Sequence, residues 1–267
     1  MKKVLFSILF FLISAKICFA GVSIIGDLSS EKIVKPGEKS EGTILLKNTG
    51  ENPHEVRVYQ TDYLFFADGR NIYGEPGSIP RSNAKWLFLS PTRFTIPPNR
   101  TASVHYNIQV PENPELKGTY WSMVMVEPMA EAIQESKEGE KAKVRLGLQT
   151  IIRYGIQIVN DIGDTGIRKI RFLDKKLISE DGKKIFQIDI ENIGERWLSP
   201  LVWIELYNEQ GQSIGRFESV KFRIYPGCSV RHRVELTNVP KGKYKVLVVA
   251  DNGDESIFGA RYDLGIE

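Results

Sequence analysis

Apolar and polar side chains alternate over a long stretch near the middle of the chain, from Val144 to Val159. One row of this stretch is apolar apart from a threonine: Val144, Leu146, Leu148, Thr150, Ile152, Tyr154, Ile156 and Ile158. The row between them is mostly polar or glycine. Successive side chains of a β-strand point to opposite faces, so the period of two predicts one long strand with an apolar and a polar face.

Strands in globular proteins usually have 3 to about 10 residues, so this one is expected to bend at Gly147 or Gly155, or to serve two structures in turn. Two interpretations fit the pattern. The strand is either buried within its own sandwich, or it lies partly at an edge and pairs with another protein. A free apolar edge aggregates unless something covers it. The preceding segment, Met129 to Lys143, is expected to be a loop that could provide this cover, with a short surface helix as the alternative.

Shorter alternating runs bounded by glycine, proline and asparagine recur along the rest of the chain. They lie at residues 43–46, 55–59, 102–110, 120–126, 185–190, 201–207, 230–236 and 243–250. No segment has a convincing helical period. Short strands at this spacing predict an all-β protein of sandwich type, and the pattern of Ile257, Arg261, Tyr262 and Leu264 suggests a last strand at the C-terminus.

A weak internal repeat predicts two tandem immunoglobulin-like β-sandwiches. Lys-Asn-Thr-Gly-Glu at 47–51, Ile-Pro-Pro-Asn at 96–99 and Lys-Gly-Thr-Tyr at 117–120 return in the same order as Glu-Asn-Ile-Gly-Glu at 191–195, Ile-Tyr-Pro-Gly at 224–227 and Lys-Gly-Lys-Tyr at 241–244. Asn-x-Gly and Pro-Gly are turn sequences that separate strands. A short polar segment at 160–165 divides the chain into a first domain, 21–160, and a second, 165–267.

The first twenty residues have the pattern of a cleavable signal peptide. Lys2 and Lys3 precede an apolar run, and Cys18-Phe19-Ala20 places small residues at the expected cleavage site. A protein that is exported to the periplasm or secreted is therefore expected, without an integral membrane anchor. Loss of this leader leaves 33 of the 36 basic side chains against 33 acidic ones, and a neutral surface argues against nucleic-acid binding.

The motif Lys-Trp-Leu-Phe-Leu-Ser-Pro-Thr-Arg-Phe at 85–94, followed by the turns at 96–99 and 110–111 and by Gly-Thr-Tyr-Trp at 118–121, resembles a known family. It is similar to the N-terminal immunoglobulin-like domain of the periplasmic pilus-assembly chaperones (PapD-like), and to the WxL-interacting cell-surface proteins. The resemblance covers Ile33 to about Val159. The second half looks like a generic envelope immunoglobulin-like module.

In the pilus-assembly chaperones, the seventh strand lends alternating apolar residues to a subunit by β-strand addition. A cleft between the domains holds the carboxylate of the subunit with an arginine from the first strand and a lysine from the seventh. The resemblance therefore implies partner-binding residues at Val144, Leu146, Leu148, Ile152 and Arg153. The arginine of the first strand has no match, because residues 21–34 offer only Lys32.

Catalytic and metal chemistry find little support in the sequence. His54, His105 and His232 are far apart in the chain, and Cys228 has no neighbouring activator. Asp-Asn-Gly-Asp at 251–254 resembles part of a calcium loop but lacks its later glutamate, which favours a hairpin turn. Met123 and Met125 share a strand face, as copper ligands or core residues would. We expect no catalytic residues, metal or cofactor, and therefore no enzyme.

The sequence thus predicts a chaperone-like protein of the periplasm or cell envelope. It would bind an extracytoplasmic protein subunit, pilin-like or a surface protein, by β-strand addition along Val144 to Val159 and the groove between the domains. The alternative is a structural or adhesive envelope protein whose tandem domains bind a wall polymer or another surface protein.

Overall fold

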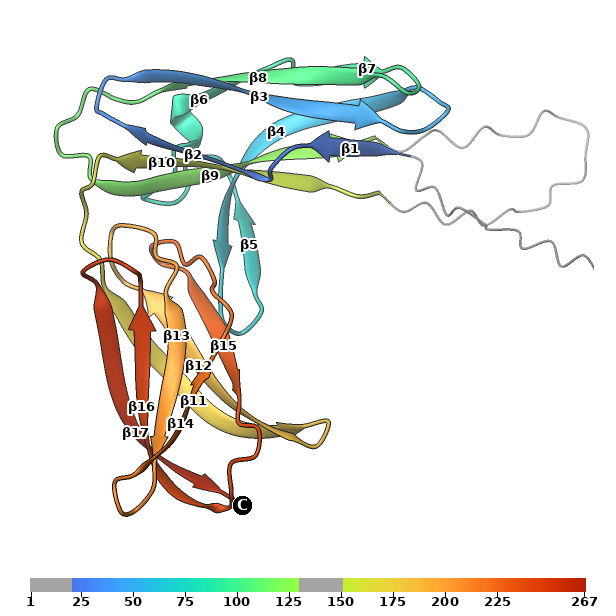
Figure 1. The fold of residues 1–267 in the computed structure, drawn as a ribbon. Helices are drawn as coiled ribbons and strands as arrows, with labels where there is room; N and C mark the ends of the chain where they lie inside the picture. Colours follow the sequence, from blue (N-terminus) through green and yellow to red (C-terminus); the bar gives the residue numbers. More distant parts are fainter. Residues whose placement is uncertain (1–20, 130–150) are drawn as a thin grey trace, which may run out of the picture.

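The computed structural model describes residues 21–129 and 151–267 and contains two β-sandwiches (Figure 1). The long axes of the sandwiches lie at a steep angle, which gives the molecule an L shape. Apart from one short 3-10 helix, η1 (Ala84–Trp86), the regular elements described are all strands. The prediction of an all-β protein with two sandwiches is confirmed. Within the described ranges, no helix is long and apolar enough to cross a membrane.

The first sandwich packs two sheets face to face around one core. Its first sheet has the order β1 (Val22–Ile25), β3 (Lys39–Asn48), β8 (Thr101–Gln109), β6 (Leu87–Ser90). Its second sheet has the order β2 (Ser29–Val34), β10 (Tyr154–Ile162), β9 (Gly118–Pro128), β4 (His54–Phe65), β5 (Asn71–Gly74), and β7 (Arg93–Ile96) also pairs with β4. Inward-facing aliphatic residues such as Leu46, Val104 and Val124 fill the space between the sheets.

The second sandwich is built in the same way from the remaining strands. One sheet has the order β11 (Ile170–Glu180), β12 (Lys183–Asn192), β15 (Ser229–Glu235). The other has the order β14 (Ser213–Glu218), β13 (Leu201–Tyr207), β16 (Gly242–Asp251), β17 (Ile257–Ile266). Its core includes Phe186, Ile188 and Ile204, none of them more than 1% exposed. β17 confirms the strand that the C-terminal pattern suggested.

The shorter predicted strands are confirmed, whereas the long one differs from its prediction. β10 begins at Tyr154 instead of Val144 and continues past Val159 to Ile162. The register of β10 with β9 would place Ile152 opposite Pro128, which has no N–H to donate, so the ladder stops there. At its other end β10 is prolonged by a parallel pairing with β2. The part of the predicted strand before residue 151, and most of the predicted loop before it, lie outside the described residues.

The Asn-x-Gly motif of the internal repeat places one buried asparagine in each sandwich, and its side chain hydrogen-bonds to the backbone. The Asn48 side-chain amide donates to the carbonyl oxygens of Asn52 and Ile96, while its Oδ1 accepts from the N–H of Gly50. Asn192 makes the same three bonds, to the carbonyls of Arg196 and Ile224 and from the N–H of Gly194. Both side chains are fully buried, and such groups must be paired because an unpaired buried amide is costly.

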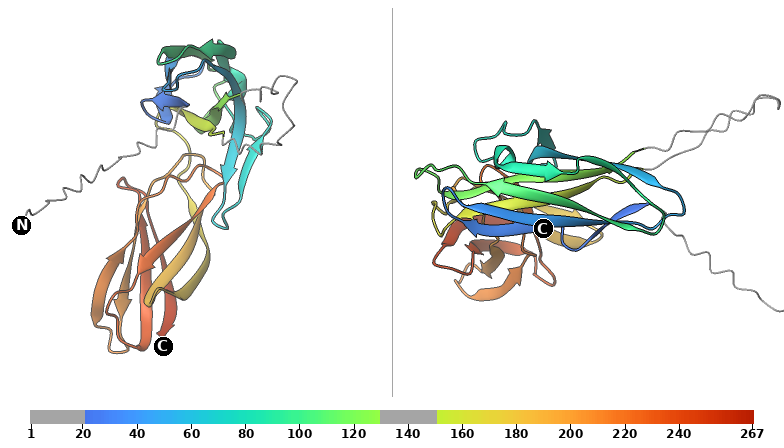
Figure 2. Two further views of the ribbon diagram at one scale, coloured as in Figure 1. Left: turned by 90° about the vertical axis from the view of Figure 1, so that its right-hand side faces the viewer. Right: turned by 90° about the horizontal axis from the view of Figure 1, so that it is seen from above.

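The first sandwich also extends an arm toward the second. This hairpin arm, residues 61–74, consists of the end of β4, a turn in which the N–H of Gly69 donates to the carbonyl of Phe66, and β5. Figures 1 and 2 show it beside the upper end of the second sandwich. Leu64 and Phe65 pack against the core of the second sandwich. The arm therefore enlarges the contact between the two halves of the molecule.

His232 on β15 makes the stability of the second sandwich depend on pH. Its ring is fully buried, with Nδ1 2.7 Å from Ser219 Oγ and the Phe222 ring edge-on at 5.3 Å. Burial lowers the pKa of this imidazole from 6.5 to about 4. The folded protein therefore keeps it neutral, whereas the unfolded chain takes up a proton as the pH falls below 6.5.

We expect the free energy of unfolding to fall by about 2 kcal/mol from this group alone between pH 7.5 and pH 5. Urea denaturation of the wild type and of the His232→Gln variant at both pH values measures it, because the variant lacks this titration. An equal pH step in the two proteins would contradict the assignment.

Candidate functional site

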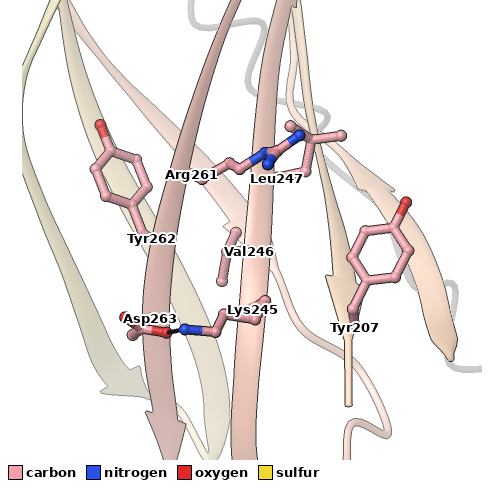
Figure 3. A pocket seen from close by; sticks show the side chains of 7 residues that line it. All are labelled: Tyr207, Lys245, Val246, Leu247, Arg261, Tyr262 and Asp263. Atoms are coloured by element: carbon pink, nitrogen blue, oxygen red, sulfur yellow. Dashed lines mark hydrogen bonds and ion pairs between the residues drawn. The ribbon is translucent and has the colours of Figure 1, made fainter. Parts of the chain in front are cut away.

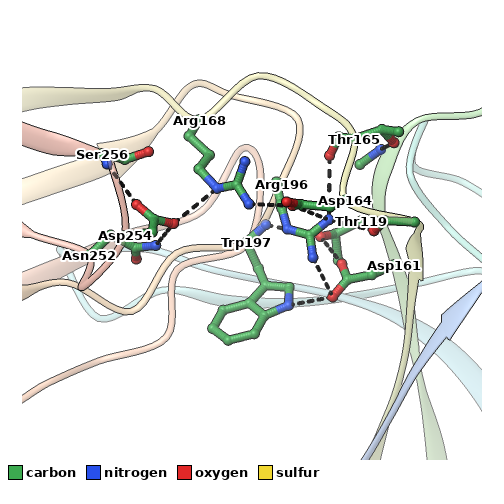
Figure 4. A network of polar contacts seen from close by, with 12 residues as sticks. Thr119, Asp161, Asp164, Thr165, Arg168, Arg196, Trp197, Asn252, Asp254 and Ser256 are labelled. Carbon is green, nitrogen blue, oxygen red and sulfur yellow. Dashed lines mark hydrogen bonds and ion pairs between the residues drawn. The ribbon is translucent and has the colours of Figure 1, made fainter.

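A buried carboxylate joins the two sandwiches. Asp161 at the end of β10 accepts hydrogen bonds from Thr119 Oγ1 (2.5 Å) and from Trp197 Nε1 (3.0 Å), and Arg196 lies 3.5 Å away as its counter-ion. Figure 4 shows this network, in which Trp197 and Arg196 come from the loop after β12. The N–H of Trp197 in turn donates to Thr119 Oγ1 at 3.0 Å. Because the charge of Asp161 is paired and hydrogen-bonded, the junction holds it without an unpaired buried ion.

A second set of polar contacts is centred on Glu195. The N–H of Ile167 donates to Glu195 Oε2 at 3.0 Å, and this bond, together with the nearby Lys117 and Arg81, lowers the pKa of the carboxyl group. Lys117 Nζ and Arg81 Nη2 lie 3.1 and 3.4 Å from the other carboxylate oxygen. Since Arg81 and Lys117 belong to the first sandwich, these ion pairs cross the junction.

The backbones also meet at this point. The N–H of Thr119 donates to the carbonyl oxygen of Glu195 at 2.9 Å. A Cβ on Gly118 would lie 2.1 Å from that oxygen, and one on Gly166 would lie 2.6 Å from Gly118 Cα. Gly118 has a φ of +72° and Gly166 of +89°. These positions therefore require glycine for two reasons, the left-handed conformation and the space.

Aromatic residues pack beside the polar groups. The rings of Trp121 and Tyr225 stack at 4.9 Å, and Phe65 of the hairpin arm meets Tyr225 edge-on at 6.2 Å. Burial raises the pKa of Tyr225 to about 12, and its hydroxyl donates to Gln157 Oε1 at 2.7 Å. This contact ties β10 to the second sandwich. A pocket of about 360 Å3 opens next to this cluster, with Leu64 and Trp121 in its wall.

A cation of the second sandwich reaches β2. Arg223 forms an ion pair with Glu31, lies 3.3 Å from Ser29 Oγ and places its guanidinium 4.4 Å from the centre of the Trp197 ring. Nearly a third of its side chain stays exposed. Val220 and Phe222, in the same loop, are also exposed. Arg223 thus bridges the second sandwich and β2, and it has exposed apolar neighbours in sequence.

The edge of β10 that faces away from β9 is only partly covered. Its parallel pairing with β2 begins at Gln157, whose N–H donates to the carbonyl of Leu28 at 2.9 Å. Backbone N–H groups two residues apart point to the same side of a strand, so the N–H of Gly155 lies on this edge as well. In the described part of the chain no group accepts from it. Within the described chain, the backbone groups of the first residues of β10 on this edge therefore have no partner.

Of the five predicted partner-binding residues, the structure describes only Ile152 and Arg153. Val144, Leu146 and Leu148 lie outside the described residues. Ile152 lies just before β10 with 47% of its surface exposed. The side chain of Arg153 is 59% exposed and lies 3.9 Å from Glu127. The assignment of these residues to a partner stays a prediction.

Sequence reasoning missed Arg223 as a residue that joins the two sandwiches. It considered cations on the first and last strands of the first sandwich, whereas Arg223 comes from the loop between β14 and β15. A single arginine in this loop has no local sequence pattern that would indicate a contact with β2. Only the docking of the second sandwich brings Arg223 to Glu31.

The cysteine, aspartates and methionines considered as candidate ligands or catalytic groups are buried or bonded as parts of the fold. Cys228 is buried, and burial raises the pKa of its thiol to about 12. Asp251 and Asp254 bond the N–H groups of Gly253 and Ser256 in the turn between β16 and β17. Met123 and Met125 are buried beside Gly155. Among residues 21–129 and 151–267, no group of three or more histidines, cysteines or carboxylates is arranged to hold a metal ion.

No known protein-family profile matches the chain, and no curated protein matches it. Among solved structures, it is similar to the class 5 fimbriae chaperone CfaA, at 14% identity and a TM-score of 0.48, over 92% of this chain and 100% of that one. It is also similar to the CsuC–CsuE chaperone–tip adhesion subunit pre-assembly complex from archaic chaperone-usher Csu pili of Acinetobacter baumannii (11% identity, TM-score 0.45, 90% of this chain and 97% of that one).

A third similar structure is a chaperone–tip adhesin complex of CFA/I fimbriae biogenesis, at 14% identity and a TM-score of 0.49, over 91% of this chain and 98% of that one. The likeness to pilus-assembly chaperones, first noted from the motifs at 85–94 and 118–121, is thus found among solved structures as well. At this level of identity it concerns the fold and carries no functional conclusion.

The glycine contact at the junction gives a testable prediction. Gly118→Ala should lower the free energy of unfolding by about 1 kcal/mol for the left-handed backbone and by about 1–3 kcal/mol more for the clash with Glu195. Gly182→Ala is the matched control, because Gly182 has a similar φ of +76° and nothing within 4 Å of its added Cβ. Urea denaturation measures both.

Small-angle X-ray scattering of the same two variants reports the angle between the sandwiches. We expect a changed scattering profile for Gly118→Ala only. Equal losses of stability and unchanged profiles in both variants would contradict the role of this contact.

Proposed function

We propose that the protein is a chaperone-like factor that binds an extracytoplasmic protein subunit, pilin-like or a surface protein, by β-strand addition along the segment Val144 to Val159, at the residues before Gln157, where the pairing with β2 begins. The observation that carries this proposal is the uncovered edge of β10, where the N–H of Gly155 has no acceptor in the described part of the chain. An extended segment of another protein that pairs here would satisfy these groups and gain main-chain hydrogen bonds. β9 already holds the opposite edge of β10 and keeps it extended.

Side-chain alternation supports the same proposal. Ile156 and Ile158 point into the core of the first sandwich, at 3% and 1% exposure. In the sequence, Val144, Leu146, Leu148 and Ile152 continue this alternating apolar row toward the N-terminus. Of these, Ile152 lies just before β10, beyond the last rung of the ladder with β9, and is 47% exposed. A partner with an open groove would bury such a row.

Arg153 is available for a charge-assisted contact. Its neighbour Glu127 is held more closely by Arg57, whose Nη2 lies 2.8 Å from the other carboxylate oxygen. Among the described residues, only Glu127 forms an ion pair with Arg153, and a carboxylate or carbonyl of the partner could accept from the other donors of this guanidinium. Arg223, with 30% of its side chain exposed, is a second cation that an anionic group of the partner could reach, in competition with Glu31.

Exchange of Leu146 and Leu148 for aspartate tests the proposal. The double variant should lose capture of its subunit by about a hundredfold or more, because two charged side chains cannot enter an apolar groove. The readout is copurification from the cell envelope, with the subunit identified by mass spectrometry and its binding then measured with the purified subunit.

The matched control is Arg145→Asp with Gln149→Asp, two acidic exchanges in the other row of the same segment. This control should retain most of the binding, since its side chains point away from the partner groove. Circular dichroism confirms that both variants are folded. Full binding by the folded Leu146→Asp/Leu148→Asp protein, or equal losses in both double variants, would rule out strand addition through the apolar row.

A further inference from the structure

β17 is a long strand at the edge of the second sandwich. It pairs with β16 in one continuous register from Ile257 to Ile266 and ends the order β14-β13-β16-β17. It contains no proline, no bulge and no charged side chain on its inward row. Among the described strands, β1, β5 and β6 have four residues each and β11 is broken by a bulge after Phe172. These devices normally protect edges from pairing, and β17 has none of them.

The backbone of β17 offers hydrogen-bonding groups at this edge. In the turn before β17, the N–H of Asn252 donates to the carbonyl of Ser256. Hydrogen-bonded pairs alternate along an antiparallel ladder, so the even-numbered residues of β17 bond to β16. The odd-numbered residues Gly259, Arg261, Asp263 and Gly265 therefore direct N–H and C=O outward. Within the described chain, no backbone bond links them to β11 of the other sheet.

The same four residues are all exposed, and the side chains of Arg261 and Asp263 lie on the outer face of the sheet. Figure 3 shows Arg261 and Asp263 on this face, with Asp263 paired to Lys245 of β16, and Tyr262 pointing the other way. Gly259 and Gly265 have no side chain to obstruct a neighbouring strand. The edge thus presents one positive and one negative charge in its centre, flanked by glycine on both sides.

We infer that β17 pairs with β17 of a second copy of this chain, antiparallel about a two-fold axis at Tyr262. In this register Arg261 lies opposite the partner's Asp263, and symmetry repeats the pair. Gly259 lies opposite the partner's Gly265. Shifting the register by one hydrogen-bonded step in either direction places Arg261 opposite the partner's Arg261, or Asp263 opposite the partner's Asp263, which is unfavourable. Charge complementarity thus selects one register.

The inward row favours the same register. Tyr262 would meet the partner's Tyr262 on the axis, and Ala260 would lie opposite the partner's Leu264. These side chains are only half-buried in the monomer, where the Lys175 ammonium lies 4.1 Å from the centre of the Tyr262 ring. Pairing buries more of this apolar surface. The product is one sheet with four strands from each copy, a closed isologous dimer. It does not depend on the proposed chaperone function.

Charge reversal tests the register. Sedimentation velocity of the purified protein over a concentration series measures the dimer dissociation constant. Arg261→Asp and Asp263→Arg should each weaken the dimer by about tenfold or more, because each places like charges opposite one another twice. The double exchange Arg261→Asp/Asp263→Arg restores opposite charges and should recover the wild-type constant. Arg216→Asp on the opposite edge strand, β14, is the control and should leave it unchanged.

A disulfide across the axis gives a second measurement. Tyr262 faces its own copy in a pair without hydrogen bonds, where Cα atoms lie about 4.5 Å apart, within the range that a disulfide bridges. Tyr262→Cys should therefore oxidise to a covalent dimer. Ala260→Cys should not, because it lies opposite the partner's Leu264. The native Cys228 is buried and does not interfere.

A protein that stays monomeric up to hundreds of micromolar would overturn the proposal. So would a dimer that both single reversals leave intact, or one that the double exchange fails to restore. Equal covalent dimerisation of Tyr262→Cys and Ala260→Cys would exclude the proposed register.

Discussion

The structure depends on one strand that serves two hydrophobic cores. Along β10, Ile156 and Ile158 point into the first sandwich, whereas Val159 joins the core of the second. Asp161 on that second face receives Thr119 from its own sandwich and Trp197 from the other. Because successive side chains of a strand face opposite ways, β10 can tie two domains together without leaving its sheet. Displacing β10 would open both cores and the buried carboxylate network together.

The same arrangement limits which part of β10 can meet a partner. From Gln157 onward, β2 occupies the free edge and the second sandwich covers the outer face. Before Gln157, β9 is the only strand of the described residues that pairs with β10. The C-terminal part of β10 thus anchors the junction, whereas the backbone groups on the other edge of its N-terminal part have no partner among the described residues. Because the C-terminal part of β10 is held in place, it fixes the position and direction of the N-terminal part. This lowers the entropic cost of ordering the strand when a partner binds.

Two neighbouring edge strands of the second sandwich, one from each sheet, differ in how they are protected. β11 is bulged after Phe172, which interrupts its ladder with β12. β17 remains regular over its whole length and carries its charges only on the outer face. Edges without protection usually pair, so a symmetric partner strand is a physical way to close this one. Both proposed contacts use backbone groups of edge strands, at opposite ends of the molecule, and they do not compete for the same residues.

Local patterns determined which segments are strands, because alternation follows from the strand geometry itself. They also revealed the repeat, since Asn48 and Asn192 need the same turn partners to be buried. The start of β10 depended on tertiary structure: alternation continues back to Val144, but Pro128 of β9 ends the ladder at Tyr154. Of the candidate site, the sequence indicated the apolar row and Arg153. The approach of Arg223 to β2 arises only when the two sandwiches dock, because contacts between residues far apart in sequence leave no periodic signal in either segment.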